Sequence, residues 1–130
     1  MAHYNSFENL EVFKKARIPS LNVWELIQTT ALKKDFELRN QINASSGSIM
    51  DNIAKGFGRG GGNKEFVNFL GYARSSYRET KSQVLKCLDR NYTSEDSFQK
   101  INNQAQELTD QLGEFSNYLK NSEKRRSKFD

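Results

Sequence analysis

The stretch "FQKINNQAQELTDQLGEFSNYL", residues Phe98–Leu119, carries the clearest structural pattern in the chain. Its apolar residues recur at alternating spacings of three and four, whereas the residues of a strand would alternate every second position. The seam consists of Phe98, Ile101, Ala105, Leu108, Leu112, Phe115 and Leu119. Ser94, followed by Glu95 and Asp96, is typical of a helix start, because carboxylates in the first turn face the positive end of the helix dipole. We therefore predict a helix from about Ser94 to Lys120.

Two segments before this one follow the same period. The first of them predicts a helix over Phe36–Phe57, and the second a helix over Lys64–Arg90, with Asn91 as the residue that ends it. The middle of the earlier helix, Asn43–Ser48, is rich in Ser and Gly, which have low helix propensity. We expect these small residues to let a neighbouring helix approach closely.

The N-terminal segment also has a helical period, but its only proline falls inside it. The apolar positions are Leu10, Phe13, Ala16, Val23, Ile27 and Ala31. Because a proline removes one intrahelical hydrogen bond and clashes with the preceding turn, we expect a kink or break near Pro19, around Arg17–Ser20. Four long segments with short links predict an all-α, antiparallel up-down-up-down four-helix bundle. The expected domain limits are 1–7 for a flexible N-terminus, 8–120 for the bundle and 121–130 for a basic flexible tail.

Composition bounds the class of protein. The chain has 130 residues, which fits one domain, and its net charge of +4 makes an acidic partner reasonable without requiring one. A single cysteine, Cys87, excludes an intramolecular disulfide and a cysteine-cluster metal site. We see no apolar leader at the N-terminus, and no stretch approaches the roughly 18 apolar residues that span a bilayer. We therefore expect a cytoplasmic protein.

A glycine-rich run, "AKGFGRGGGNKEF" (Ala54–Phe66), spells G-x-G-x-x-G from Gly56 to Gly61. A dinucleotide-binding loop needs a β-strand before it, but the preceding "SIMDNIAK" has a helical pattern. A Walker-type loop is excluded as well, because no G-K-[ST] follows. We therefore interpret the run as a turn between two helices.

Within this turn, we expect Gly56 and Gly58 to end one helix with positive φ, and Asn63 or Gly62 to cap the next. One functional alternative stays open. The free N–H groups at the start of the next helix, with Arg59 and Lys64 beside them, would make a small site for a phosphate.

A search for catalytic residues finds no constellation. His3 is the only histidine, so the chain lacks the residues that a catalytic triad or a histidine metal site would need. Cys87 lies near an apolar seam and is expected to be a buried hydrophobe. Ser48 and Asn52, one turn apart, are interpreted as a buried hydrogen-bonded pair that fixes packing, with a substrate contact as the minor alternative. We predict no enzyme activity, no cofactor, no metal and no small-molecule substrate.

The basic residues support a first binding hypothesis. The segment Lys64–Arg90 holds six basic and three acidic residues, whereas Ser94–Lys120 holds two basic and five acidic ones. Three cations recur at helical spacing and would share one face toward a phosphate backbone, and a basic arm at the C-terminus would add to it. These residues are Arg74, Arg78 and Lys81, and, in the arm, Lys124, Arg125, Arg126 and Lys128. Tyr72, if exposed, could stack on a base. The alternative is that these are ordinary solvated helix faces.

A second hypothesis is an assembly scaffold that binds another protein. Leu21 and Trp24 lie off the main seam of the first helix, and apolar residues at the start of the third occupy more than one face. One bundle seam cannot bury both sets, so subunit contacts are expected. The third-helix set is Phe66, Val67, Phe69, Leu70 and Tyr72.

The stretch "SIMDNIAKGFGRGGGNKEFVNFLGYARSS" (Ser48–Ser76) resembles the signature of a bacterial four-helix-bundle family. That family is encoded in intervening sequences of 23S ribosomal RNA genes and is also labelled ribosomal-protein-like. The opening "FENLEVFKKA" (Phe7–Ala16) is similar to the family's start. The matching positions are Asn52, Ile53, Ala54, Gly56, Gly58, Arg59, Lys64, Glu65, Phe66, Phe69 and Leu70. Lys55 stands where the family has Glu, Asp51 where it has Ser, the linker is about one glycine longer, and Pro19 is atypical.

The resemblance implies a ring-like homopentamer without established enzymatic activity. It also implies a relation to the accessory proteins of diversity-generating retroelements (accessory variability determinants), which bind a reverse transcriptase and nucleic acid through a basic surface. The expected function is thus a non-enzymatic accessory protein that binds RNA or DNA as a homo-oligomeric ring. The alternative is a protein-interaction scaffold, for example a reverse-transcriptase partner, without nucleic-acid contact.

Overall fold

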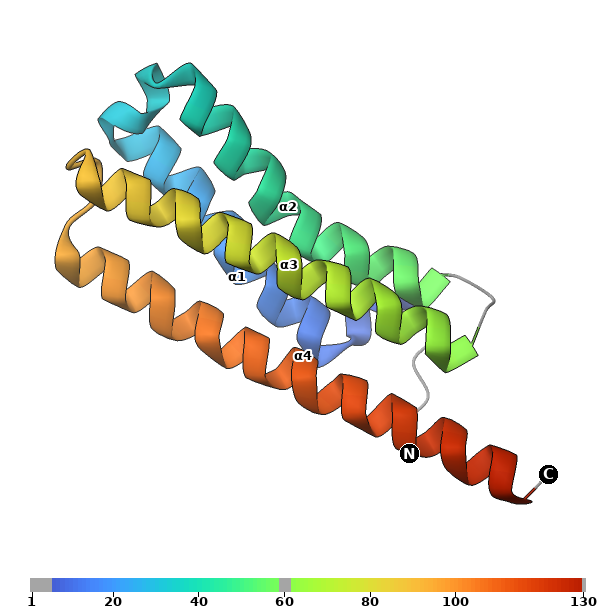
Figure 1. The fold of residues 1–130 in the computed structure, drawn as a ribbon. Coiled ribbons are helices and arrows are strands. Elements are labelled where there is room, and N and C mark those ends of the chain that lie inside the picture. Colours follow the sequence, from blue (N-terminus) through green and yellow to red (C-terminus); the bar gives the residue numbers. More distant parts are fainter. Residues whose placement is uncertain (1–5, 59–61, 130) are drawn as a thin grey trace.

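The protein folds into four helices that lie alongside one another (Figure 1). The computed structural model describes the backbone of residues 6–58 and 62–129, and side chains as far as residue 122. The helices are α1 (Glu11–Thr29), α2 (Phe36–Gly58), α3 (Gly62–Asp89) and α4 (Glu95–Phe129), with two short 3-10 helices, η1 (Phe7–Asn9) and η2 (Ala31–Lys34). Within these ranges there is no strand, and α1 and α3 each pack against both α2 and α4. The predicted all-α four-helix bundle is confirmed.

The ends of α2 and α3 lie within two residues of the predicted ones, and the start of α4 agrees as well. Ser94 caps α4, because its Oγ accepts a hydrogen bond from the Ser97 N–H at 3.1 Å. The other end of α4 differs from the prediction, since the helix continues past Lys120 to Phe129. The stretch 121–129 contains neither Gly nor Pro, so nothing in it stops the helix. Figure 1 shows this part of α4 reaching beyond the last turn of α2 and the first turn of α3.

Of the kink or break expected near Pro19, the break does not occur. The helix α1 is continuous from Glu11 to Thr29, with Pro19 buried inside it. A proline at this position costs roughly 3 kcal/mol in a free helix. Ala16 and Val23, one turn before and after, are 0 % and 2 % exposed, so core packing holds both halves of α1 in place.

The core consists of two apolar clusters, one toward each end of the bundle. A buried polar seam between α2 and α3 joins them. Ser45 Oγ lies 2.5 Å from Gln83 Oε1, to which it donates, and 2.9 Å from Thr80 Oγ1, from which it accepts. Ser45 and Ser46 are almost fully buried, so the small residues of α2 do face a neighbouring helix, as expected.

The glycines of the turn act differently from the prediction. Gly56 and Gly58 both lie inside α2, and the one described glycine with positive φ is Gly62, at +76°. A Cβ on Gly56 would lie 2.7 Å from the Cβ of Phe69, so Gly56 lets α3 approach closely. The prediction for Asn91 is confirmed, because its φ of 60° ends α3 in the left-handed region.

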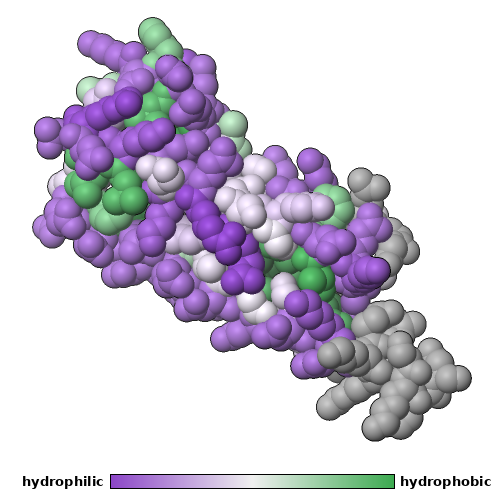
Figure 2. All heavy atoms as spheres, in the orientation of Figure 1, coloured by the Kyte–Doolittle hydropathy of each residue, from purple (hydrophilic) through white to green (hydrophobic). Residues whose placement is uncertain are grey.

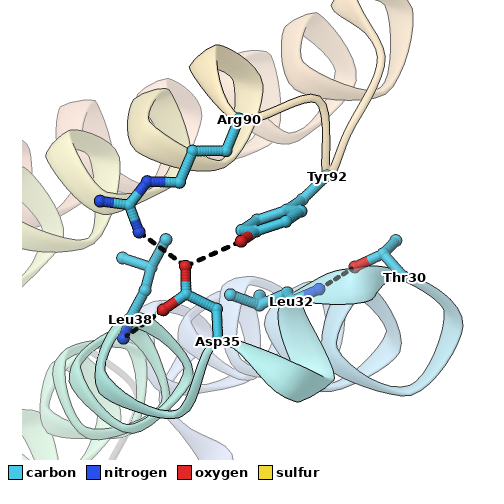
Figure 3. Close-up of polar contacts among 6 residues, drawn as sticks. All are labelled: Thr30, Leu32, Asp35, Leu38, Arg90 and Tyr92. Atoms are coloured by element: carbon cyan, nitrogen blue, oxygen red, sulfur yellow. Dashed lines mark hydrogen bonds and ion pairs between the residues drawn. The ribbon is translucent and has the colours of Figure 1, made fainter.

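At the other end of the bundle, Asp35 ties two links together (Figure 3). Its Oδ2 accepts hydrogen bonds from Arg90 Nη1 at 2.6 Å and from the Tyr92 hydroxyl at 2.8 Å. Its Oδ1 accepts one from the N–H of Leu38, in the first turn of α2, at 3.4 Å. The Tyr92 hydrogen bond, and then Arg90, lower the pKa of Asp35. The cluster therefore anchors the η2–α2 link to the α3–α4 link.

Candidate nucleic-acid interface

The face on which α3 lies between α2 and α4 is mostly hydrophilic, with hydrophobic areas confined to separate patches (Figure 2). In the part of the chain that the structure describes, no helix has an apolar stretch long enough to cross a membrane. A binding role for this face therefore has to come from its polar and charged side chains.

Three basic residues of α3 lie along its boundary with α4. The guanidinium of Arg74 covers Gly113, since a Cβ on that glycine would lie 4.0 Å from Arg74 Cζ. Lys81 lines a small cavity of about 20 Å³ together with Asn102 of α4. Arg78 lies between these two cations on the same face and is exposed. The structure thus brings the three cations into one row, which we call the basic row.

The line of α4 side chains beside the basic row is uncharged, and one carboxylate lies next to it. Asn102, Gln106, Thr109 and Gly113 recur at spacings of four, three and four, so they form one line on α4. The neighbouring Asp110 accepts a hydrogen bond from Gln106 Nε2 at 3.1 Å. The basic row is therefore flanked mainly by amide and hydroxyl groups, which leaves this face with excess positive charge.

Polar groups on this face lack partners within the described part of the chain. None of the three cations of the basic row forms an ion pair there, whereas Lys15 pairs with Glu107 and Arg90 with Asp35. Arg74 Nε is buried and has no hydrogen-bond acceptor among the described residues. A buried donor without an acceptor costs free energy. Because this nitrogen is shielded from solvent, an external acceptor would have to contact the exposed part of the Arg74 side chain.

The buried hydroxyl of Tyr77 also lacks a partner among the described residues. Tyr77 lines the same small cavity as Lys81 and is 5 % exposed. Burial, and to a smaller extent the negative charge of Asp110, raises the pKa of Tyr77. This tyrosine therefore stays neutral at physiological pH.

The other predicted contact residues stand apart from the basic row. Lys64 is exposed in the first turn of α3, ten residues or about 15 Å along the helix from Arg74. Arg59 lies outside the described residues, as do the side chains of the C-terminal arm, Lys124, Arg125, Arg126 and Lys128. Asn63 does not cap α3, because it lies inside the helix and its Nδ2 donates to the carbonyl oxygen of Leu119 at 3.0 Å.

Tyr72 is 56 % exposed, which meets the condition set for base stacking. Its ring meets that of Phe69 edge-on, with centroids 5.5 Å apart. Phe69 packs toward Gly56 of α2, so Tyr72 lies on the α2 side of α3. The tyrosine and the basic row therefore face different directions.

The polar pair of the sequence motif lies at the interface between α2 and α3. Asn52 Nδ2 donates to the Ser48 carbonyl oxygen at 2.8 Å and lies 3.0 Å from Ser48 Oγ. Ser48 Oγ in turn accepts a hydrogen bond from Ser76 Oγ of α3 at 3.0 Å. These contacts support the interpretation of a hydrogen-bonded pair that fixes packing, but Ser48 and Asn52 are half-buried and not buried as expected. An open groove of about 660 Å³ lies beside it, with Ser48 in its lining.

Among the described residues, no group of three His, Cys, Asp or Glu side chains could hold a metal ion. Cys87 is fully buried, and burial raises the pKa of its thiol to about 11, which keeps it protonated and unreactive. His3 lies outside the described residues.

The sequence interpretation missed the amide line of α4 and the role of Gly113. The spacing of Asn102, Gln106 and Thr109 was visible in the sequence, one helical face away from the apolar seam. What the sequence lacked was the register of α4 against α3, which places Gly113 under Arg74.

Comparisons with known proteins agree with this fold. A model of the 23S rRNA-intervening sequence protein family matches residues 8–114. Among solved structures, a protein of unknown function from the S23 ribosomal protein family of Bacteroides thetaiotaomicron is similar, with a TM-score of 0.71 and 22 % sequence identity. The match covers 81 % of this chain and 97 % of that one, and at this identity it shows the fold alone. No curated protein matches the chain. Because the family match covers most of the sequence, this chain belongs to the 23S rRNA-intervening sequence protein family.

Proposed function

We propose that this protein is a non-enzymatic accessory factor that binds RNA or DNA through the α3–α4 face. The observation that carries the proposal is the basic row, Arg74, Arg78 and Lys81, which has no ion-pair partner in the described part of the chain. A phosphate backbone supplies the acceptors that these side chains lack, and its binding releases counterions. Amides of α4 beside the row add hydrogen-bonding groups for sugars, phosphates or bases.

The second part of the proposal is that the protein acts as a homo-oligomer, which the family resemblance implies to be a ring of five subunits. The support from the structure is apolar surface on α1, where Leu21 is 61 % and Trp24 57 % exposed. Each subunit would repeat the basic row, so weak contacts with one nucleic-acid strand would multiply.

A protein-interaction scaffold remains the second candidate, because the same exposed residues of α1 fit a protein partner. In that case, a partner such as a reverse transcriptase would bind α1 and the basic row would have no nucleic acid to contact. The relation to retroelement accessory proteins stays a prediction.

The test is a fluorescence-anisotropy titration with labelled RNA and DNA oligonucleotides at about 50 mM salt. The variant Arg74→Ala/Arg78→Ala/Lys81→Ala removes the basic row. The matched control, Lys33→Ala/Lys34→Ala/Lys55→Ala, removes the same charge from exposed positions on η2 and α2.

We expect the basic-row variant to lose at least tenfold in affinity and the control to lose less than threefold, because only the basic row contacts phosphates. Equal losses in the two variants would mean that net charge alone drives binding. The absence of binding by the wild-type protein to either oligonucleotide would leave the scaffold as the better hypothesis.

A further inference from the structure

The guanidinium of Arg74 lies against the backbone of α4 at Gly113. A Cβ placed on Gly113 would lie 4.0 Å from Arg74 Cζ and 4.0 Å from Arg74 Nη2. Because these two bonded atoms are equally far from that point, the Cζ–Nη2 bond runs across the glycine and does not point at it. Gly113 has no side chain that would keep the planar group away from α4.

The described residues do not neutralise the charge of Arg74. Arg74 forms no ion pair with them, and its buried Nε has no acceptor among them. The residue as a whole is half-buried, so part of its side chain is accessible. A guanidinium that is positioned by packing, and not by a carboxylate, keeps its outer side available to a ligand.

Open space adjoins this guanidinium on α3. Long side chains of a helix lean toward its N-terminus, so Arg74 leans toward the turn that contains Gly71. Gly71 is exposed, and a Cβ placed on it would meet nothing within 4 Å. One glycine on each helix therefore borders Arg74. We call Gly71 and Gly113 the glycine gap.

We propose that Arg74 stacks on one nucleobase of a single-stranded nucleic acid at the glycine gap. A guanidinium is planar and weakly hydrated, and it stacks on aromatic rings. Arg78 and Lys81, farther along the basic row, contact the phosphates of neighbouring nucleotides. This inference rests on the proposed function and adds to it the class of nucleic acid and a role for Arg74 beyond its charge.

A single strand fits this role better than a duplex. In a duplex each base is stacked between its neighbours, so a side chain reaches its face only after the base leaves the stack. The bases of a single strand can turn outward and stack on aromatic side chains or on guanidinium planes. The helix α4 also offers an amide for the edge of such a base, since Asn117 is exposed and lies one turn beyond Gly113.

An exchange of arginine for lysine separates stacking from charge. Arg74→Lys keeps the positive charge and removes the planar group, and Arg78→Lys is the matched control within the basic row. The probe is labelled oligoadenylate, whose binding to the full-length protein is followed by fluorescence anisotropy. We expect Arg74→Lys to bind it at least about fivefold more weakly than the wild type, and Arg78→Lys to stay within about twofold of the wild type.

An abasic strand of the same length gives a readout that a merely structural role of Arg74 would not produce. This strand keeps the phosphates but has no base to stack, so the wild type and both variants should bind it within about twofold of one another. Arg74→Lys should also keep the wild-type slope of log affinity against log salt concentration, because the charge remains. An equal loss of affinity for oligoadenylate and for the abasic strand would overturn the stacking role.

The duplex of oligoadenylate with oligothymidylate tests the class of nucleic acid. At about 200 mM salt, where phosphate contacts contribute less, the wild type should bind the single strand at least about fivefold more tightly than the duplex. Arg74→Lys should remove most of this preference. A duplex that binds the wild type as tightly as the single strand would overturn the assignment to single strands.

Substitutions at Gly113 test the position of the guanidinium. Gly113→Ala adds a Cβ at an ordinary contact distance from Arg74, so this variant should bind oligoadenylate as the wild type does. Gly113→Leu would push the guanidinium away from α4 and should weaken binding of oligoadenylate as Arg74→Lys does, with binding of the abasic strand unchanged. Wild-type affinity of Gly113→Leu for oligoadenylate would contradict a platform positioned by α4.

The outcomes separate this inference from the proposed function. If the wild type binds oligoadenylate and the two lysine variants bind it equally well, the stacking role is refuted and the proposed function stands. If the wild type binds neither the single strands nor the duplex, the proposed function is refuted and this inference with it.

Discussion

The two sides of α3 differ in whether their buried polar groups have hydrogen-bond partners. On the α2 side, Ser45 donates a hydrogen bond to Gln83 and accepts one from Thr80, and Gly56 admits the side chain of Phe69. On the α4 side, Arg74 Nε and the Tyr77 hydroxyl have no hydrogen-bond partner among the described residues.

The difference separates polar residues whose hydrogen bonds fix the packing of the bundle from buried polar groups that have no partner among the described residues. Buried polar groups that are fully partnered specify one packing arrangement, whereas unpartnered ones cost free energy unless a ligand satisfies them. This contrast supports a packing role for the α2 side of α3, whereas the proposed nucleic-acid binding concerns the α4 side.

The largest expected effect comes from adding a methyl group where α2 and α3 lie in close contact. The variant Gly56→Ala would place a Cβ 2.7 Å from the Cβ of Phe69, an atom that cannot move without its backbone. We expect a loss in the upper part of the roughly 1–3 kcal/mol range of overpacked cores, measured by urea unfolding. Gly47→Ala, also in α2 but with nothing within 4 Å of the added Cβ, should gain about 0.5–1 kcal/mol. Equal effects of the two substitutions would show that the helices do not approach closely at Gly56.

A smaller loss is expected from the polar seam. Ser45→Ala removes the donor to Gln83 and the acceptor for Thr80, so buried polar atoms lose their partner. The expected cost is about 1–2 kcal/mol in the free energy of unfolding. Ser82→Ala, at an exposed position of α3, is the control and should change stability by less than about 0.5 kcal/mol. A cost for Ser45→Ala as small as that of the control would argue against the seam as a packing device.

The α4 side of α3 should respond in the opposite sense. Tyr77→Phe removes a buried hydroxyl that has no partner in the described part of the chain, while it keeps the ring in place. We expect the free energy of unfolding at pH 7 to stay the same or to rise by up to about 1 kcal/mol. A loss of more than about 1 kcal/mol in urea unfolding would show that the hydroxyl is satisfied after all, and the contrast between the two sides of α3 would fail.

The smallest predicted effect is a loss of stability at alkaline pH that depends on Tyr77. The pKa of Tyr77 is raised above its ordinary value of 10.0, mainly by burial, so folding favours the neutral phenol. Its contribution to stability is complete below pH 10 and is lost as the pH rises through the raised pKa. Between pH 10 and 12 the wild type should therefore lose more stability than Tyr77→Phe, as followed by circular dichroism. Parallel curves for the two proteins would contradict the burial of this phenol.

Periodicity predicted the helices well because each apolar seam is long and has few breakers. Seven apolar residues from Phe98 to Leu119 and the cap at Ser94 located the start of α4. A kink or break near Pro19 was predicted from the local cost of a proline. The helix α1 is not broken there, because packing on both sides of Pro19 supports it. Local propensity carries no information about such tertiary support.

The candidate site was predictable only in part. The spacing of Arg74, Arg78 and Lys81 placed three cations on one face, but not toward any particular helix. The α4 residues that lie beside these cations depend on the register of α4 against α3, which places Gly113 beside Arg74 and Asn102 near Lys81. Gly56 was predicted to end α2 with positive φ, but it lies inside α2 and makes room for Phe69 of α3. A contact of this kind between two helices leaves no local signal in the sequence.

The salt dependence of nucleic-acid binding tests the role of the α4 side of α3 most directly. For duplex DNA, each phosphate contact contributes about 0.9 to the slope of log affinity against log salt concentration, and for a single strand about 0.7. We expect the slope of Arg74→Ala/Arg78→Ala/Lys81→Ala to be shallower than that of the wild type by about 2–3. The control Lys33→Ala/Lys34→Ala/Lys55→Ala should keep the wild-type slope. If the basic-row variant kept the wild-type slope as well, these three residues would not contact phosphates, and the binding role assigned to this face would be wrong.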